Sequence, residues 1–238
     1  MPWKIAQAFV ARCSEANDVS RLVSEFLEKS AAFGFSAVAA GGWVGVGAER
    51  FHRFYFNTWP AEWAAIYQRE NVFENDPIVA EARRSMRPFL WSEIRDAPMI
   101  TAAENKIFEL ADAFGWRTGF AVPIHGPATY VGLVAFAAME KVALDAADRA
   151  ALEFMALAIH RRCHATPGFG LAPASAPLTP RQLECLRWVA VGKSDFEIAA
   201  LLGLSQPTVH FHVEEAKKRI GVRSRVQLVA RLVLEGVL

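Results

Sequence analysis

The chain has 238 residues, of which 53% are hydrophobic, and carries a formal net charge of +1. This length accommodates one large domain or two smaller ones, and the hydrophobic content argues against a disordered chain. Its three cysteines, Cys13, Cys163 and Cys185, are far apart and form no CxxC pair, which argues against a disulfide scaffold or a cysteine-based metal site. Without a signal peptide or an apolar run of about 18 residues, we expect a cytoplasmic protein with no membrane span.

The first part of the chain mixes helical and strand patterns. The segment SRLVSEFLEKSAAFG has apolar residues at helical spacing and ends on Gly34. Helical segments are also predicted at 101–115 and 144–165, and GPAT (126–129) is a candidate hairpin turn. Five β-leaning runs are found at 35–44, 51–57, 87–94, 117–126 and 130–139. Together they predict an α+β domain, an α-β-α sandwich with a five-stranded antiparallel sheet.

The clearest break is ATPGFGLAPASAPLTP, which is rich in Pro, Gly, Ala and Ser and has no charge. Such composition cannot bury an apolar face and indicates a linker. We therefore predict a first domain over 1–165, a linker over 166–177 and a second domain over 178–238. The second domain holds nine Lys and Arg against six Asp and Glu, a net charge of +3, which permits nucleic-acid binding without requiring it.

The second domain is predicted to be all-α, with four short helices and clear start and stop signals. Helix N-terminal capping boxes are predicted at Thr179 with Gln182, Ser194 with Glu197 and Ser224 with Gln227. Gly203, Gly221 and Gly236 stand where helix ends favour a left-handed residue. The second helix, the GLS turn and the third helix form a helix-turn-helix pattern.

The third of these helices has two different faces. Val209, Val213, Ala216 and Ile220 share a face that should pack inward. The opposite side, which could enter a major groove, presents Phe211, Glu214 and Lys218, flanked by His210 and Lys217. Lys193, Arg223 and Arg225, in or near turns, suit phosphate contacts. Spacing alone also allows a four-helix bundle with a solvated charged face.

This segment resembles the helix-turn-helix of the LuxR family of transcription regulators. The matching residues are Leu178, Thr179, Leu186, Gly192, Lys193, Ser194, Glu197, Ile198, Ala199, Leu202, Ser205, Thr208, Val209, His212, Val222 and Arg225. It departs from the family at Gln182, usually Glu, and at Glu215, where Asn is common. The resemblance implies that His210 reads bases, and Glu214 is a candidate acceptor for a cytosine amino group. The predicted DNA-binding residues are Lys193, Thr208, His210, Phe211, Glu214, Lys218, Arg223 and Arg225.

In the first domain, Trp59, Trp63 and Tyr67 are four residues apart and would share one face of a helix. Such an aromatic stripe is by itself more often core than binding site. Asp76 before Pro77 is by itself more often a helix cap. Neither feature alone indicates a site.

The joint series Trp63, Tyr67, Asp76, Trp91 and Gly119 resembles the autoinducer-binding domain of LuxR-type quorum-sensing regulators, which bind N-acyl-homoserine lactones. The resemblance implies that the Trp63 indole donates to the lactone carbonyl and that Asp76 accepts from the amide N–H. Tyr67 would donate nearby and Trp91 would form an aromatic wall. Asp76 would cap a helix with one oxygen and bind the signal with the other, while Gly119 would meet a backbone or close-packing requirement.

Two departures from this pattern concern the acyl tail. Trp59 stands where many relatives have Tyr, and Ala135 stands where Ser or Thr is frequent. Both make the tail end more apolar, and the aromatic residues Phe51, Phe54, Tyr55 and Phe56 are near in sequence. We therefore expect a short, branched or aryl tail rather than a long 3-oxo chain. The predicted ligand-binding residues are Trp59, Trp63, Tyr67, Asp76, Trp91 and Ala135.

The resemblance also implies a homodimer that binds a palindromic promoter site, with RNA polymerase as a further candidate partner, no membrane association and no cofactor besides the signal. Helix 144–165, with apolar Leu152, Met155, Ala156 and Ile159, is the candidate dimer element. Packing on its own sheet is an equally supported interpretation of this helix and does not exclude the first.

Other classes of protein are less well supported. The chain has no HExxH metal motif, no GxSxG nucleophile elbow and no phosphate-binding glycine loop, so we do not expect an enzyme. His160 and His164, beside Arg161 and Arg162, indicate a solvated helix face. The amino terminus lacks the initial strand and acidic cluster of a phospho-receiver. The remaining alternative is a regulator of the same architecture that responds to a non-lactone small molecule, against which the Trp63 and Asp76 pair argues.

Overall fold

The computed structural model describes residues 2–16, 18–44, 51–69, 72–97, 100–126, 130–166, 178–234 and 237–238. The chain forms two compact units, one that takes in most of residues 1–171 and one that contains residues 172–238. The linker predicted at 166–177 and the turn predicted at 126–129 lie almost wholly outside the described residues.

The first unit is built on a five-stranded sheet with the strand order β2-β1-β5-β4-β3. The strands are β1 (Ala37–Val44), β2 (Phe51–Asn57), β3 (Phe89–Leu90), β4 (Thr118–His125) and β5 (Val131–Ala138). The central strand β5 pairs antiparallel with β1 and β4, so that Ala135 lies opposite Ala39 on one side and Ala121 on the other. The predicted sheet is thereby confirmed. The run predicted as a strand at 87–94 is shorter, because a helix begins at Trp91.

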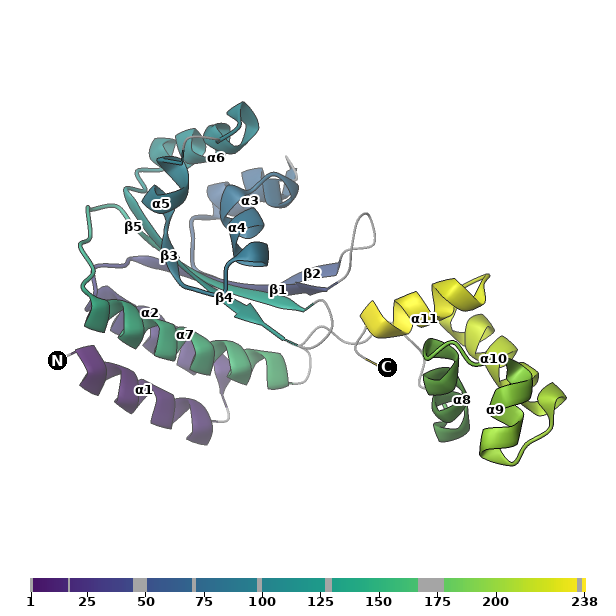
Figure 1. The fold of residues 1–238 in the computed structure, drawn as a ribbon. Coiled ribbons are helices and arrows are strands. Elements are labelled where there is room, and N and C mark those ends of the chain that lie inside the picture. Colours follow the sequence, from purple (N-terminus) through teal and green to yellow (C-terminus); the bar gives the residue numbers. More distant parts are fainter. Residues whose placement is uncertain are drawn as a thin grey trace. The chain divides into compact units, whose positions relative to one another are not determined.

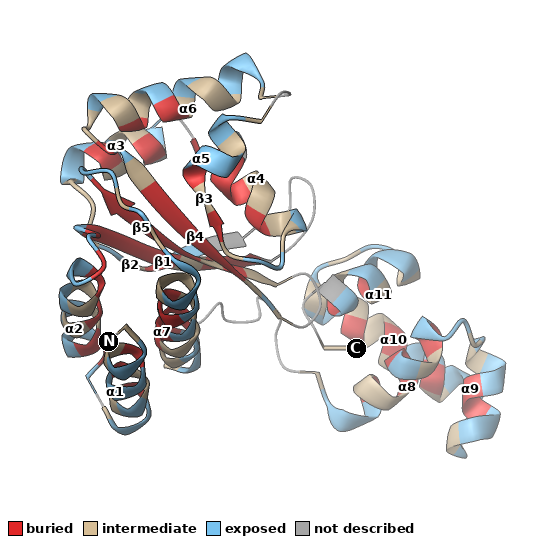
Figure 2. Ribbon diagram, turned by 60° about the vertical axis from the view of Figure 1, so that its left-hand side comes forward, coloured by how far each residue is buried: buried red, intermediate tan, exposed pale blue. Residues whose placement is uncertain are grey.

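Helices cover both faces of this sheet (Figure 1). One face carries α1 (Pro2–Glu15), α2 (Val19–Ala31) and α7 (Ala146–Ala165). The other carries α3 (Ala61–Arg69), α4 (Pro77–Arg84), α5 (Trp91–Arg95) and α6 (Ala102–Ala113), with the short 3₁₀ helix η1 (Val72–Glu74). Buried residues are concentrated on the strands and on the helix sides that face them (Figure 2), so the sheet separates two cores. The α-β-α sandwich is confirmed.

Helix α7 packs on its own sheet. Leu152, Met155, Ala156 and Ile159 are each 0% exposed and belong to the core formed with α1 and α2. Packing against the sheet is therefore confirmed for these four residues, and a role of this helix in a dimer stays a prediction.

His160 corrects a second expectation for α7. It is 2% exposed rather than part of a solvated face, and its Nε2 lies 2.8 Å from the Tyr130 hydroxyl. That hydroxyl lies 2.8 Å from the Tyr55 hydroxyl, which in turn lies 2.9 Å from Nδ1 of the exposed His164. A Cβ added to Gly132 would lie 2.2 Å from His160 Nε2, so this glycine leaves the room that the imidazole occupies.

Burial of His160 predicts acid sensitivity. Burial and then the neighbouring His164 lower the pKa of His160 from 6.5 to about 4. Because the pKa is lower in the folded state, the contribution to the free energy of unfolding is complete above pH 6.5 and is lost as the pH falls towards 4. The full loss corresponds to about 3 kcal/mol. In urea unfolding at neutral and acid pH, His160→Gln should lose less stability on acidification than the wild type.

The control for this measurement is His164→Gln, which changes the exposed histidine of the same cluster. It should keep most of the wild-type acid dependence, because burial is the first cause of the lowered pKa of His160 and His164 is the second. Equal losses of stability in wild type and His160→Gln would contradict the prediction.

The second unit consists of α8 (Pro180–Ala190), α9 (Asp195–Leu202), α10 (Gln206–Ile220) and α11 (Arg225–Leu234). All three predicted capping boxes are present, and Gly203 and Gly221 end their helices in the left-handed conformation, with φ of 65° and 75°. Val209, Val213 and Ala216 are buried in the core of this unit, as predicted. The predicted end signal at Gly236 lies outside the described residues. No helix in the described ranges is both long and apolar enough to cross a membrane.

Candidate functional site

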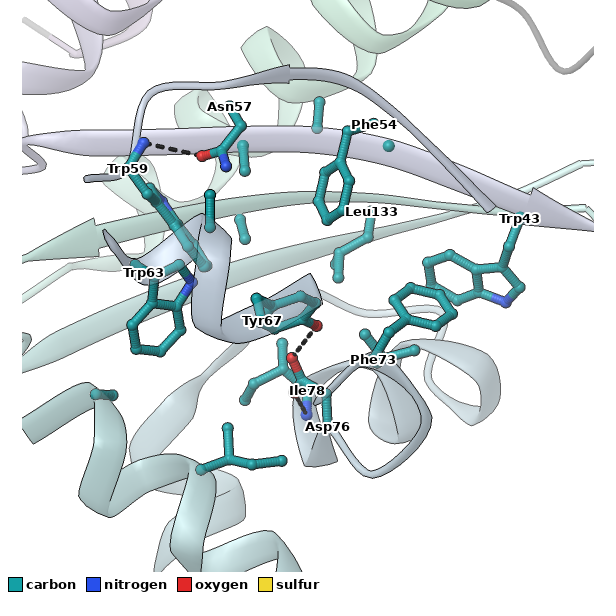
Figure 3. Close-up of a pocket in the computed structure, with 18 of the residues that line it drawn as sticks. Trp43, Phe54, Asn57, Trp59, Trp63, Tyr67, Phe73, Asp76, Ile78 and Leu133 are labelled. Carbon is teal, nitrogen blue, oxygen red and sulfur yellow. Dashed lines mark hydrogen bonds between the residues drawn. The ribbon is translucent and has the colours of Figure 1, made fainter. Parts of the chain in front are cut away.

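A cavity of about 200 Å³ lies between the sheet and the helices α3 to α6 of the first unit. Small residues of β1 and β5, among them Ala39 and Gly41, lie against it from the sheet side. All six residues predicted to bind a ligand line this cavity: Trp59, Trp63, Tyr67, Asp76, Trp91 and Ala135. Figure 3 shows several of these side chains turned towards one another. The structure therefore brings the predicted residues together, and their contact with a ligand stays a prediction.

Asp76 is the central polar group of the cavity. Its Oδ1 accepts from the Ile78 backbone N–H at 2.8 Å and so caps α4, with Pro77 at the first helical position. Its Oδ2 accepts from the Tyr67 hydroxyl at 2.6 Å (Figure 3). The predicted cap is confirmed, and the Tyr67 hydroxyl, expected to donate near the ligand, donates to Asp76.

The charge state of this pair follows from its burial. Burial raises the pKa of Asp76, while hydrogen bonds from Tyr67, Ile78 and Val79 lower it. Burial, followed by the charge of Asp76, raises the pKa of Tyr67 well above 10.0, so the phenol keeps its proton and remains a donor. A carboxylate has about four acceptor positions, of which these three donors occupy three. Asp76 can therefore accept one further N–H.

Tryptophans that line the same cavity as Asp76 carry indole N–H donors without a hydrogen-bond partner in the part of the chain that the structure describes. Trp59, Trp63 and Trp91 line the cavity, with the Trp59 ring 5.2 Å from that of Trp63 and 6.3 Å from that of Trp91. Among the described residues, their buried Nε1 atoms have no hydrogen-bond partner, nor does Nε1 of Trp116. A buried donor without an acceptor costs about 1–3 kcal/mol. The cavity is thus suited to a ligand that carries carbonyl oxygens and at least one N–H.

Gly119 acts through packing, as predicted. A Cβ added at this position of β4 would lie 1.8 Å from Cδ2 of Trp91. Only a residue without a side chain lets the indole of Trp91 approach the strand this closely. Gly119 therefore positions the wall of the cavity and does not itself line it.

Some lining residues were not foreseen. Trp43, Arg53, Asn57 and Phe73 also face the cavity, and the Asn57 side chain accepts from the Trp59 backbone N–H at 2.9 Å. For Asn57, the available sequence signal was its position at the end of a predicted strand, two residues before Trp59.

The aromatic run expected near the acyl tail divides between the two faces of the sheet. Phe54 lines the cavity, whereas Tyr55 and Phe56 pack in the opposite core. The side chain of Phe51 lies outside the described part of the structure. Only Phe54 of this run thus contributes to the cavity among the described side chains.

In the second unit, the predicted DNA-binding face of α10 is exposed at His210, Phe211 and Lys218, and Arg223 is exposed beyond it. Several predicted residues have partners within the unit: Glu214 binds Lys217 at 2.8 Å, Lys218 binds Glu215 at 2.8 Å, Lys193 binds Glu197 at 2.9 Å, and the Thr208 hydroxyl lies 2.7 Å from that of Ser205. The cytosine-accepting role predicted for Glu214 would therefore compete with Lys217.

Arg225 is engaged inside the unit. Its Nη1 binds Oδ1 of Asp195, and its Nη2 donates to the Lys193 carbonyl at 2.7 Å. These bonds join the start of α11 to the start of α9. Its phosphate contact stays a prediction, beside this structural role, which the sequence did not indicate.

In the described part of the chain, no three His, Cys, Asp or Glu side chains are placed to bind a metal ion.

Family models match both units of the chain. The autoinducer binding domain matches residues 18–163, and the model of bacterial regulatory proteins of the luxR family matches residues 176–232. The chain belongs to the LuxR family. As a LuxR-family member it is a quorum-sensing transcription regulator that combines an autoinducer-binding domain with a helix-turn-helix DNA-binding domain, and it is not an enzyme.

Individual relatives agree with this assignment. The transcriptional activator VanR of Vibrio anguillarum is 31% identical over 76% of this LuxR-family chain and 75% of VanR. The quorum sensing-dependent regulator RpaR of Rhodopseudomonas palustris is 28% identical over 94% of this chain and 91% of RpaR. The crystal structure of Escherichia coli SdiA has the same fold, with a TM-score of 0.82 at 18% identity over 98% of both chains.

Proposed function

We propose that this regulator binds an N-acyl-homoserine lactone in the cavity of its first unit and, as a homodimer, binds a palindromic promoter site. The observation that carries the ligand proposal is the buried Asp76 carboxylate, which lines the same cavity as Trp59, Trp63 and Trp91 with their buried indole N–H groups, unpartnered among the described residues. The cavity offers one acceptor and several donors. An acyl-homoserine lactone has the complementary set, one amide N–H and two carbonyl groups.

Each polar group of such a ligand has a candidate partner. Trp63 Nε1 donates to the lactone carbonyl, and Asp76 accepts from the amide N–H. Trp59 Nε1 donates to the amide carbonyl, where Ala135 offers no side-chain donor. The indole of Trp91 covers one side of the ligand.

The tail is the part of the ligand that the cavity walls select. Trp59, Phe54 and Leu133 are bulky apolar residues of the lining, and the cavity measures about 200 Å³. These walls favour a short, branched or aryl acyl group over a long chain, because a long chain would have to displace them.

Thermal unfolding tests the ligand class. The panel contains butanoyl-, 3-methylbutanoyl-, benzoyl- and dodecanoyl-homoserine lactone. At a hundredfold excess over Kd, a bound lactone stabilises the fold by about 2.7 kcal/mol, which raises Tm by about 5–10 °C. We expect this rise for a short, branched or aryl member. A largest rise with the dodecanoyl compound would contradict the tail assignment, and no rise with any lactone would contradict the ligand class.

A non-lactone ligand is the second candidate. SdiA, at 18% identity, has been solved in complex with octanoyl-rac-glycerol, which has no amide N–H for an acceptor such as Asp76. This compound therefore belongs in the same panel. A rise with it alone, equal in wild type and Asp76→Asn, would favour this second candidate over a lactone.

The DNA proposal follows from the second unit. Two copies of α10 would enter successive major grooves of a palindrome, with RNA polymerase as a further candidate partner. Sedimentation of the lactone-bound chain should give a dimer, and footprinting should show two half-sites about one helical turn, or a multiple of it, apart. A monomer that protects a single half-site would contradict this proposal.

A further inference from the structure

The exposed imidazole of His210 on α10 is held by a carboxylate from another helix. Its Nδ1 lies 3.2 Å from Oδ2 of Asp195, at the start of α9. The His210 side chain is 65% exposed, whereas that of Asp195 is 13% exposed. The imidazole is therefore anchored on one edge, and its other nitrogen, Nε2, remains for an outside partner.

The second oxygen of Asp195 is also occupied. Oδ1 binds Arg225, whose guanidinium is anchored in turn by the Lys193 carbonyl. Because a guanidinium only donates, the atom that faces Arg225 must be an acceptor. The nearby Glu214 binds Lys217 instead, so Asp195 is the carboxylate that contacts His210.

This geometry determines where the imidazole proton lies. A carboxylate accepts hydrogen bonds, so Nδ1 must carry the proton and donate to Asp195. In the neutral ring Nε2 is then an acceptor. In the major groove only adenine and cytosine offer an amino donor, whereas guanine offers the acceptors N7 and O6.

We propose that Asp195 is a positioning residue for DNA recognition: it fixes the tautomer of His210 and makes this regulator select adenine or cytosine at the base that His210 contacts. The inference rests on the proposed base-reading role of His210. To that role the inference adds Asp195 as the residue that determines which base His210 contacts, and the His210 tautomer as the physical reason.

Asp195→Asn provides a sharp test, because Arg225 dictates how the new amide is oriented. The amide oxygen must face Arg225, so the NH₂ group faces His210 Nδ1. Nδ1 then becomes the acceptor and Nε2 carries the proton. The preferred base should change from adenine or cytosine to guanine, by about fivefold in relative affinity, the effect of one hydrogen bond.

The experiment is selection from a randomised DNA pool at pH 8 with the full chain. The protein is saturated with whichever panel lactone stabilises it, or is ligand-free if none does. His210→Ala identifies the base pair concerned, because the preference there should disappear. Glu184→Gln is the matched control, since it removes one carboxylate of α8 that pairs with Arg181, and the base preference should be unchanged.

The outcomes distinguish the positioning role of Asp195 from the base-reading role of His210. A preference lost in His210→Ala and moved to guanine in Asp195→Asn supports the inference. A preference lost in His210→Ala but unchanged, or uniformly weakened, in Asp195→Asn overturns it and leaves the base-reading role standing. An unchanged preference in His210→Ala overturns both.

A second measurement does not depend on the folding of any variant. Nitrogen-15 NMR of the wild-type chain at pH 8 reports which ring nitrogen of His210 is protonated. A proton on Nδ1 supports the inference, and a proton on Nε2 overturns it.

Discussion

Asp76→Asn should remove most of the stabilisation by the lactone while leaving the ligand-free chain about as stable as the wild type. Burial raises the pKa of Asp76 above 3.8, which means that the folded state disfavours the ionised form. The contribution of this group to stability is complete at acid pH and is lost as the pH rises through the pKa of the folded state. An uncharged Asn avoids that cost at neutral pH and still caps α4.

Binding of the lactone, unlike the stability of the ligand-free chain, should be weakened by Asp76→Asn. With one oxygen committed to the cap, the Asn NH₂ group would face the ligand amide N–H, so two donors would meet. Loss of a hydrogen bond to a charged acceptor, about 1.5–3 kcal/mol, weakens binding by about 10- to 100-fold. Calorimetric titration and thermal unfolding of the same samples would measure both effects.

Glu81→Gln is the control for Asp76→Asn. It removes a carboxylate from the same helix, one that pairs with Arg84 and does not line the cavity. Lactone affinity should be unchanged. Wild-type affinity in Asp76→Asn would refute the assigned role of the carboxylate.

Gly119→Ala should destabilise the first unit by about 3 kcal/mol, at the upper end of the usual cost of overpacking a core. The added Cβ would lie 1.8 Å from the Trp91 ring, and Gly119 is held in register opposite Ala137 of β5, so the strand cannot retreat. The indole must therefore move. Since Trp91 lines the cavity, lactone binding should weaken together with stability.

A double-mutant cycle identifies the clash as the cause. Trp91→Leu removes the ring, so Gly119→Ala should cost much less in that background, with a coupling energy of about 1–3 kcal/mol. Gly115→Ala adds the same methyl where nothing lies within 4 Å, at a φ of +81°, and should cost only about 1 kcal/mol. Additive costs in the cycle would show that Gly119 is required for another reason.

The sequence determined those features whose cause lies within a few residues along the chain. Ser194 with Glu197 and Ser224 with Gln227 form the expected capping boxes, because each box joins residues three positions apart. The same holds for Asp76 before Pro77. Five strands were also found from local composition, although Trp91 begins a helix where a strand was expected.

The tertiary structure decided which of these local elements meet. His160 is buried because Tyr130 and a glycine of β5 receive it, and Tyr55 lies 109 residues from its partner His164. Asp195 and Arg225 are 30 residues apart, and neither shows in the sequence that it binds the other. The periodicity of apolar residues in a helix or strand predicts which residues share one of its faces. What covers that face, and which buried polar atoms find partners, depends on chain segments that only folding brings together.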